Sequence, residues 1–185
     1  DINENGKIYL NTFSFNENPQ IYFYPASTVK FPAAILALEK LNDINISGVN
    51  KNTHLSIDSV FENHVSFDKD FKDECGYLNI ANYLKKIFLV SDNEAFNRLY
   101  DFLGQKEINE RIRKRGFNNT KIVHRLEVAR TEEQNMQTNP IKFYDYEGNI
   151  IYEQPARFDS TDIKLELTET IKGIGYYSND VLVNE

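Results

Sequence analysis

The sequence has few of the residues from which disulfides, metal sites and membrane spans are built. Its single cysteine, Cys75, excludes a disulfide within the chain, and none of the three histidines is placed to act as the base of a thiol nucleophile. The spacing of cysteine and histidine gives no zinc site, and no glycine-rich phosphate loop is present. No stretch approaches the roughly 18 apolar residues of a membrane span. We therefore expect a chain that works without a metal or other cofactor.

Basic residues are also too few and too scattered for a nucleic-acid partner. The chain of 185 residues carries 21 Lys and Arg against 28 Asp and Glu, a formal net charge of −7. A nucleic-acid backbone requires clustered positive charge, and the one dense basic stretch, 111–115, follows acidic residues and is typical of an exposed helix end. Apolar residues at 41% and charged residues at 26% are typical of a folded globular protein.

Apolar periodicity predicts a helical middle with strands at both ends. Segments 7–15 and 21–24 are rich in strand formers and predict a hairpin. Segment 141–152 predicts a second hairpin, which turns at Gly148-Asn149. Helices are predicted at 27–41, 77–88, 92–103 and 106–115.

The helix predicted from Ser27 has a regular apolar pattern. Its apolar residues recur at steps of three and four, at Phe31, Ala34, Ile35, Leu38 and Leu41. Such a stripe predicts that this face of the helix lies against the core. Pro32 falls in the first turns, where a missing amide hydrogen costs little.

Ser27 and Lys30 form a Ser-x-x-Lys motif at the start of this helix. Three residues are nearly one helical turn, so the two side chains share a face. A desolvated lysine can take the proton of a serine hydroxyl, and the helix N-terminus favours developing negative charge. Taken alone, the motif also fits a hydroxyl cap followed by a surface lysine.

Two further motifs follow along the chain. Ser91 and Asn93 belong to a Ser-Asp-Asn run at the junction of two predicted helices, where a hydroxyl and an amide could serve a substrate. The same run also has the composition of a helix N-cap. Arg125 and Glu127 follow a Gly-Phe-Asn-Asn turn and, taken alone, also fit an ordinary surface pair.

Together, the Ser-x-x-Lys, Ser-Asp-Asn and Arg-x-Glu motifs resemble those of the class A β-lactamases and related penicillin-recognising serine hydrolases. The resemblance covers about residues 20–130, and the position of Glu127 fits the class A branch. It implies an α/β (α+β) fold of the β-lactamase/transpeptidase type, with an antiparallel sheet flanked by helices and a helical lobe at about 40–135. We expect a single catalytic domain over 1–185 that is incomplete at both ends.

The resemblance also implies a role for each residue at the site. Ser27 would attack a carbonyl and form an acyl-enzyme, with its own backbone amide as one oxyanion donor, and Lys30 would hold or receive its proton. Ser91 would pass a proton to the leaving nitrogen, and Asn93 would bind the side-chain amide of the substrate. Glu127 would activate the water that releases the acyl group.

The loop around this glutamate both follows the family and departs from it. Arg125 would brace the loop and Asn97 would support it. Val128 stands where the family commonly has proline, and Thr131 stands where a family asparagine helps to hold the hydrolytic water. Asn135 could replace that asparagine only in a rearranged loop. These departures leave the efficiency of acyl release open.

A larger departure is the missing Lys-Thr/Ser-Gly strand, which in the family binds the substrate carboxylate. Lys172-Gly173 offers no such triplet, so we expect the chain to be a fragment of a longer protein.

Three functions stay open on the sequence. The first is a serine hydrolase that opens β-lactam rings, and the second is a D,D-peptidase or other penicillin-binding enzyme that acts on peptidoglycan-like acyl substrates. The third is a non-catalytic binding module with the same fold. The resemblance alone implies export to the periplasm or cell envelope and a role in antibiotic resistance, and the oligomeric state stays unknown.

Overall fold

A computed structural model describes these parts of the chain: residues 11–15, 17–18, 21, 23–61, 78–159, 176–178 and 181–183. The chain divides into two compact units, one formed by Pro25–Leu165 and the other by Asp1–Tyr24 with Glu166–Glu185. In the second unit, strand β6 (Tyr176–Ser178) pairs antiparallel with strand β7 (Val181–Val183).

The first predicted hairpin falls partly outside the described residues. Those described between 11 and 24 form no regular strand, apart from an isolated bridge at Ile21. The prediction of strands at 11–15 and 23–24 is therefore wrong for the described residues, and the rest of that prediction lies outside them.

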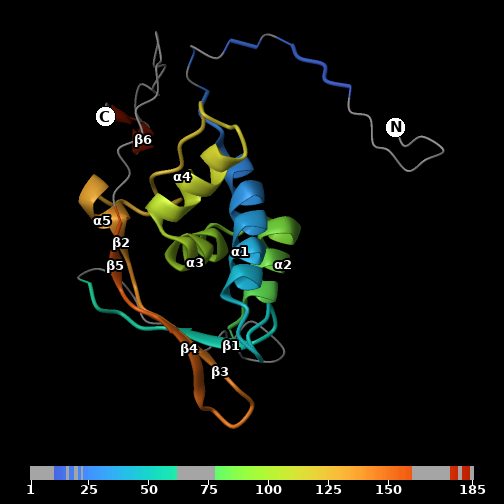
Figure 1. Cartoon of the computed structure of the whole chain (residues 1–185). Helices are drawn as coiled ribbons and strands as arrows, with labels where there is room; N and C mark the ends of the chain where they lie inside the picture. The colour runs from blue at the N-terminus through green and yellow to red at the C-terminus, as the bar shows by residue number, and fades with distance from the viewer. Residues whose placement is uncertain are drawn as a thin grey trace, which may run out of the picture. The chain divides into compact units, whose positions relative to one another are not determined.

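The unit Pro25–Leu165 combines helices with small antiparallel sheets (Figure 1). Its helical elements are the 3₁₀ turn η1 (Ala26–Val29), α1 (Lys30–Ile44), α2 (Ile80–Val90), α3 (Asn93–Leu103), α4 (Gln105–Lys114) and α5 (Glu132–Met136). Its strands are β1 (His54–Ile57), β2 (Gln137–Thr138), β3 (Ile141–Tyr144), β4 (Ile150–Gln154) and β5 (Arg157–Phe158). One sheet has the order β1-β3-β4, and β2 pairs with β5. The predicted hairpin at 141–152 is confirmed as β3 and β4.

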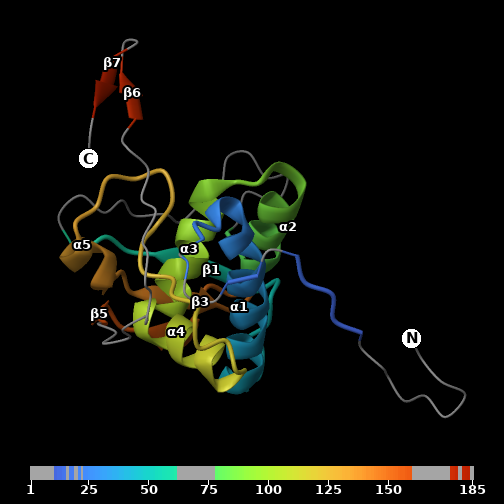
Figure 2. The same cartoon turned by 90° about the horizontal axis from the view of Figure 1, so that it is seen from above.

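Helix α3 packs against both α1 and α2 (Figure 2). Its large apolar side chains are fully buried, among them Phe96, Leu99 and Tyr100. Phe102 near its end packs on Phe143 of β3 with ring centroids 5.8 Å apart, which joins the helix to the sheet. A helix enclosed in this way is a rigid base for functional side chains.

The ends of α3 are set by local sequence. The Asp92 side chain accepts a hydrogen bond from the amide of Ala95 at 2.8 Å, as an N-cap does. Gly104, with φ of +82°, ends the helix and allows α4 to begin at once. The helices predicted at 92–103 and 106–115 are therefore confirmed as α3 and α4.

Helix α1 faces the core with only part of the predicted stripe. Three members of that stripe are at least 37% exposed: Phe31, Ile35 and Leu38. The buried face instead contains Ala33 and Ala37, whose small side chains allow close packing with α3, together with Lys30 and Lys40. The prediction that the stripe lies in the core is therefore wrong for Phe31, Ile35 and Leu38, and it is confirmed for Ala34 and Leu41, which are 2% and 6% exposed.

Helix α5 lies in a stretch for which no periodic structure was predicted. Thr131 and Gln134 form a capping box, in which each side chain accepts a hydrogen bond from the backbone amide of the other. The Thr-x-x-Gln pattern was the available signal for this short helix.

Candidate active site

Ser27 and Lys30 lie where the turn η1 passes into α1. Ala26 has φ of +46°, a left-handed conformation that is uncommon for a residue other than glycine. The turn is fixed by Thr28, which donates its amide and its hydroxyl to the carbonyl of Pro25 at 3.1 and 2.7 Å. Lys30 Nζ lies 3.2 Å from Ser27 Oγ. Ser27 is exposed whereas Lys30 is only 3% exposed, so the serine is open to a substrate and the amine is shielded from solvent.

Ser91 meets this pair from the junction of α2 and α3. Its left-handed backbone, with φ of +54°, ends α2. Lys30 Nζ donates to Ser91 Oγ at 3.0 Å and to the Ser91 carbonyl, and Ser91 Oγ donates to Ser27 Oγ at 3.3 Å. The two hydroxyls and the amine thus form a closed triangle of hydrogen bonds, which is a route along which a proton can move.

Burial makes the amine of Lys30 easier to deprotonate than that of an exposed lysine. Burial lowers the pKa of its amine below the ordinary value, although the carboxylates of Asp92 and Glu127 partly oppose this shift. Four oxygens lie within hydrogen-bonding distance of Nζ, on Ser27, Ser91 (two) and Asn93. The Ser91 carbonyl and Asn93 Oδ1 can only accept from Nζ, whereas the hydroxyls of Ser27 and Ser91 can also donate a proton to a neutral amine.

Glu127 is connected to this group through Asn93. Asn93 Oδ1 accepts from Lys30 Nζ at 2.5 Å, and Asn93 Nδ2 donates to Glu127 Oε2 at 2.7 Å. Glu127 is exposed, and its φ of +59° is a strained backbone conformation that the surrounding structure must hold. Among the described hydrogen bonds, the connection from Glu127 to Lys30 runs through this one amide.

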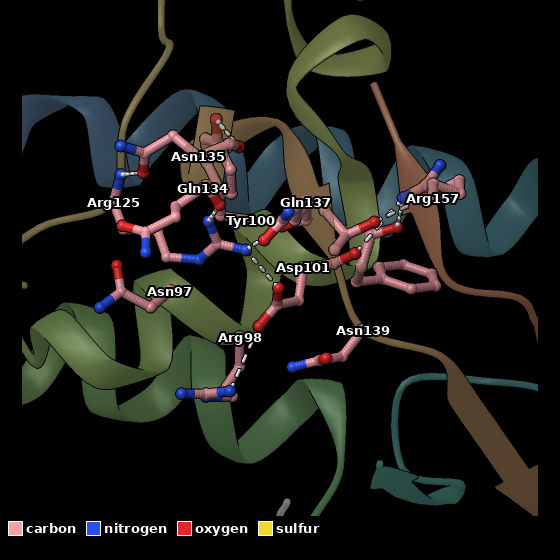
Figure 3. A network of polar contacts seen from close by, with 12 residues as sticks. Asn97, Arg98, Tyr100, Asp101, Arg125, Gln134, Asn135, Gln137, Asn139 and Arg157 are labelled. Carbon is pink, nitrogen blue, oxygen red and sulfur yellow. Dashed lines mark hydrogen bonds and ion pairs between the residues drawn. The ribbon is translucent and has the colours of Figure 1, made fainter. Parts of the chain in front are cut away.

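The backbone beside Glu127 is held by buried polar side chains. The amide group of Asn97 accepts from the Leu126 N–H and donates to the Leu126 carbonyl, both at 2.9 Å. Arg125 is buried and donates to Asp101 Oδ1 at 2.6 Å and to the carbonyl of Gln137 at 2.7 Å (Figure 3). The loop that carries Glu127 runs from Arg125 to Gln137. The structure therefore places the two predicted supporting residues where they hold it, Asn97 against its backbone and Arg125 at its start.

Thr131 and Asn135 are both used inside the loop. The Thr131 hydroxyl caps α5. Asn135 Oδ1 accepts from the amide of Arg125 at 2.9 Å, and Asn135 Nδ2 donates to the Thr131 carbonyl at 3.0 Å. The described hydrogen bonds of these two side chains therefore support the loop and leave Glu127 with Asn93 as its partner.

The structure brings all five residues predicted to act on a substrate into one connected group: Ser27, Lys30, Ser91, Asn93 and Glu127. Sequence reasoning missed the part played by Asp101. The signal for it was its spacing, because Asp101 follows Asn97 by four residues and so lies on the same face of α3.

Within the described ranges, no group of three or more His, Cys, Asp or Glu side chains is arranged as a metal site. No helix in the same part of the chain is long and apolar enough to cross a membrane. Export to the cell envelope and the single-domain organisation over 1–185 stay predictions.

Comparison with known proteins identifies one family. The sequence model of the family described as Beta-lactamase enzyme family matches residues 7–149, more than half of the chain. No curated protein and no solved structure gives a match. The mixed α/β structure with a small antiparallel sheet agrees with the fold expected from this family. The chain belongs to the Beta-lactamase enzyme family, a family of β-lactamase-like serine hydrolases.

Proposed function

We propose that this chain opens β-lactam rings through an acyl-enzyme on Ser27. The observation that carries this proposal is the place of Lys30 Nζ, which is buried and lies 3.2 Å from Ser27 Oγ and 3.0 Å from Ser91 Oγ. Burial lowers the pKa of this amine, so a larger fraction of it is neutral and able to act as a base near neutral pH.

In the first half of the reaction, Ser27 Oγ attacks the lactam carbonyl carbon while its proton passes to Lys30 Nζ. The backbone N–H of Ser27, at the start of the helical segment, is one donor to the oxyanion that forms. As the ring C–N bond breaks, Ser91 Oγ gives its proton to the nitrogen and takes one from Lys30. Both side chains end this half-reaction in their starting protonation states.

In the second half, Glu127 takes a proton from a water molecule, and the resulting hydroxide attacks the ester carbonyl on Ser27. The C–O bond to Ser27 then breaks, and the proton that Glu127 took from water passes to the serine oxygen. The hydrolysed product leaves with both side chains in their starting protonation states. Glu127 is exposed, so water reaches its carboxylate. Asn93, which contacts both Lys30 and Glu127, is the group that holds the substrate amide.

A second candidate is a penicillin-binding peptidase that acylates at Ser27 but releases the acyl group slowly. The observation that favours it is the use of the Thr131 and Asn135 side chains inside the loop. Asn93 is then the one described side chain that bonds to Glu127, and a hydrolytic water has fewer groups to hold it.

The test is intact-mass analysis of the protein mixed with a penicillin and sampled from seconds to hours. Ser27→Ala removes the nucleophile, and Ser56→Ala on strand β1 is the matched control. An adduct that requires Ser27 and is lost as hydrolysed penicillin accumulates supports the hydrolase. A Ser27-dependent adduct that persists supports the peptidase. No adduct from the folded protein contradicts acylation by β-lactams and leaves another acyl substrate or a binding role.

A further inference from the structure

Helix α3 holds the loop around Glu127 with one side chain from each of three successive turns. Asn93, Asn97 and Asp101 are spaced four residues apart and so share one face of the helix. The first bonds to the Glu127 carboxylate and the second to the backbone of Leu126. The third, Asp101, bonds to the guanidinium of Arg125. The chain direction of the loop is therefore opposite to that of α3, and each of its residues from Arg125 to Glu127 is held by one of these side chains.

We propose that Asp101 is a positioning residue for Glu127. It acts through Arg125 and does not itself touch the substrate. The inference rests on the proposed role of Glu127 in releasing the acyl group, and it assigns to a buried carboxylate of α3 the task of keeping that glutamate in place.

The contact between Asp101 and Arg125 is a desolvated ion pair. The side chains are 2% and 4% exposed, and Arg125 Nη2 lies 2.6 Å from Asp101 Oδ1. The guanidinium also lies over the ring of Tyr100, 4.9 Å from its centroid (Figure 3). Because a buried charge without a partner is strongly unfavourable, loss of the carboxylate drives Arg125 to move toward solvent.

Arg125 in turn holds both ends of the loop. Its own backbone lies at the entry, directly before Leu126, and its guanidinium donates to carbonyls at the exit. These are the carbonyls of Gln134 at 3.2 Å and Gln137 at 2.7 Å (Figure 3). Movement of Arg125 therefore loosens the entry and the exit together, and Glu127 lies two residues from the entry.

The groups of the acylation step lie outside this loop. Ser27 belongs to η1, Lys30 begins α1 and Ser91 follows α2. Loss of the Asp101 carboxylate should therefore slow acyl release while the acylation rate stays within about twofold of the original. A misplacement of a catalytic group by 1 Å can cost about a hundredfold in rate, so we expect release to slow by roughly tenfold to a hundredfold.

Arg98 provides a matched control. It pairs with the other oxygen of the same carboxylate, Asp101 Oδ2, at 3.2 Å, from one turn earlier on α3. Arg98→Gln removes a charge next to Asp101, and none of the described hydrogen bonds joins Arg98 to Arg125. A general weakening of α3 should appear in this variant as well, whereas the positioning effect should not.

The experiment compares Asp101→Asn with Arg98→Gln and the original protein in two measurements. Hydrogen exchange, followed over peptides from 122 to 137, should rise in Asp101→Asn and stay unchanged in Arg98→Gln. With a penicillin, Asp101→Asn should form the adduct at the rate of the original protein and lose it more slowly. If Asp101→Asn does not fold, Asp101→Glu keeps the charge, moves it by one methylene, and should show the same separation to a smaller degree.

The outcomes distinguish this inference from the function on which it rests. Loop exchange equal to that of the original protein, or acyl release at the original rate, would overturn the role of Asp101. Equal slowing of acylation and release would assign Asp101 a purely structural role and overturn it too. If the original protein forms no adduct, the proposed function is wrong, and the exchange measurement still decides whether Asp101 holds the loop.

Discussion

Lys30 and Lys40 show how one helix can use two buried lysines for different ends. Both lie on the buried face of α1, at 3% and 7% exposure. The amine of Lys30 is surrounded by hydroxyl and amide oxygens next to an exposed serine. The amine of Lys40 instead donates to the Phe102 carbonyl and to Glu107, both at 2.7 Å. Residue type and burial alone therefore do not show which lysine is the base. The groups that surround each amine do show it.

Replacement of Lys30 by methionine keeps the apolar stem and removes the amine. We expect Lys30→Met to slow acylation by roughly a hundredfold to ten-thousandfold, the usual contribution of a general base. The protein should still fold, because methionine suits a buried site. Lys40→Met is the control, since its amine bonds to other groups, and it should acylate at the original rate. Stopped-flow acylation with each variant measures this, and an unchanged rate in Lys30→Met would rule out its role as base.

The pH dependence of acylation follows from the direction of the Lys30 shift. Burial lowers the pKa of this amine, so it is neutral over a wider range of pH than an exposed lysine. The acylation rate should rise with pH and level off once Lys30 is neutral, with a midpoint below the ordinary lysine value of about 10.4. Rates measured from pH 5 to pH 10 test this. A rate that falls steadily over this range would contradict it.

At the scale of single elements, side chains from two other elements converge on the end of α3. Lys40 and Arg157 both donate to the carbonyl of Phe102, in the last turn of the helix, where positive charge is favourable. Gly104 follows with φ of +82°. A Cβ atom at Gly104 would lie 2.4 Å from Asp159 Oδ2 and 2.8 Å from Arg157 Nη2.

Gly104→Ala should therefore destabilise the protein through both backbone strain and crowding. We expect a loss of about 2–4 kcal/mol in the free energy of unfolding. Gly116→Ala is the matched control, because Gly116 has φ of +88° but nothing within 4 Å of an added Cβ, and its loss should be about 1 kcal/mol from the backbone alone. Urea denaturation of the two variants gives the comparison. Equal losses would show that the crowding at Gly104 is relieved without cost.

Lys40 should make the stability depend on pH in the alkaline range. Burial lowers its pKa to about 8, against 10.5 for the ordinary side chain, so between these values the unfolded chain binds more protons than the folded one. The contribution of Lys40 to stability therefore rises as the pH rises from about 8 to about 10.5. The size of this change is on the order of 3 kcal/mol.

Lys40→Met removes the group from which this dependence arises. As the pH rises from 7 to 10, the unfolding free energy of the original protein should increase relative to that of the variant. Denaturation at several pH values measures it. A difference that stays constant would show that Lys40 keeps its ordinary pKa in the folded state.

The elements that could be predicted from the sequence are those with local signals. Helices α3 and α4 follow from periodicity and from the stop at Gly104, and the hairpin of β3 and β4 follows from its Gly-Asn turn. Only part of the buried face of α1 could be predicted in this way, because that face combines small alanines with lysines. Its lysines are buried only because distant groups supply hydrogen-bond partners.

At the scale of the whole molecule, the motifs predicted which residues meet but not what holds them together. Ser27, Ser91 and Glu127 come from three separate parts of the chain and are joined by Lys30 and Asn93. The contacts that hold the loop to α3, from Asn97 to Leu126 and from Asp101 to Arg125, depend on tertiary packing, which a motif does not encode. The family match over residues 7–149 covers the whole of this group.

The central claim is that Ser27 carries the acyl group and that Glu127 removes it. In Glu127→Gln, the base of the second half-reaction is lost while Ser27, Lys30 and Ser91 are unchanged. Incubation of this variant with a penicillin, followed by digestion and tandem mass spectrometry, locates any trapped acyl group.

We predict a long-lived acyl group on Ser27, in near-stoichiometric amount, that forms at the rate of the original protein. No acyl group, or one on another residue, would contradict the account of the nucleophile. Release from Ser27 at the original rate would contradict the account of Glu127.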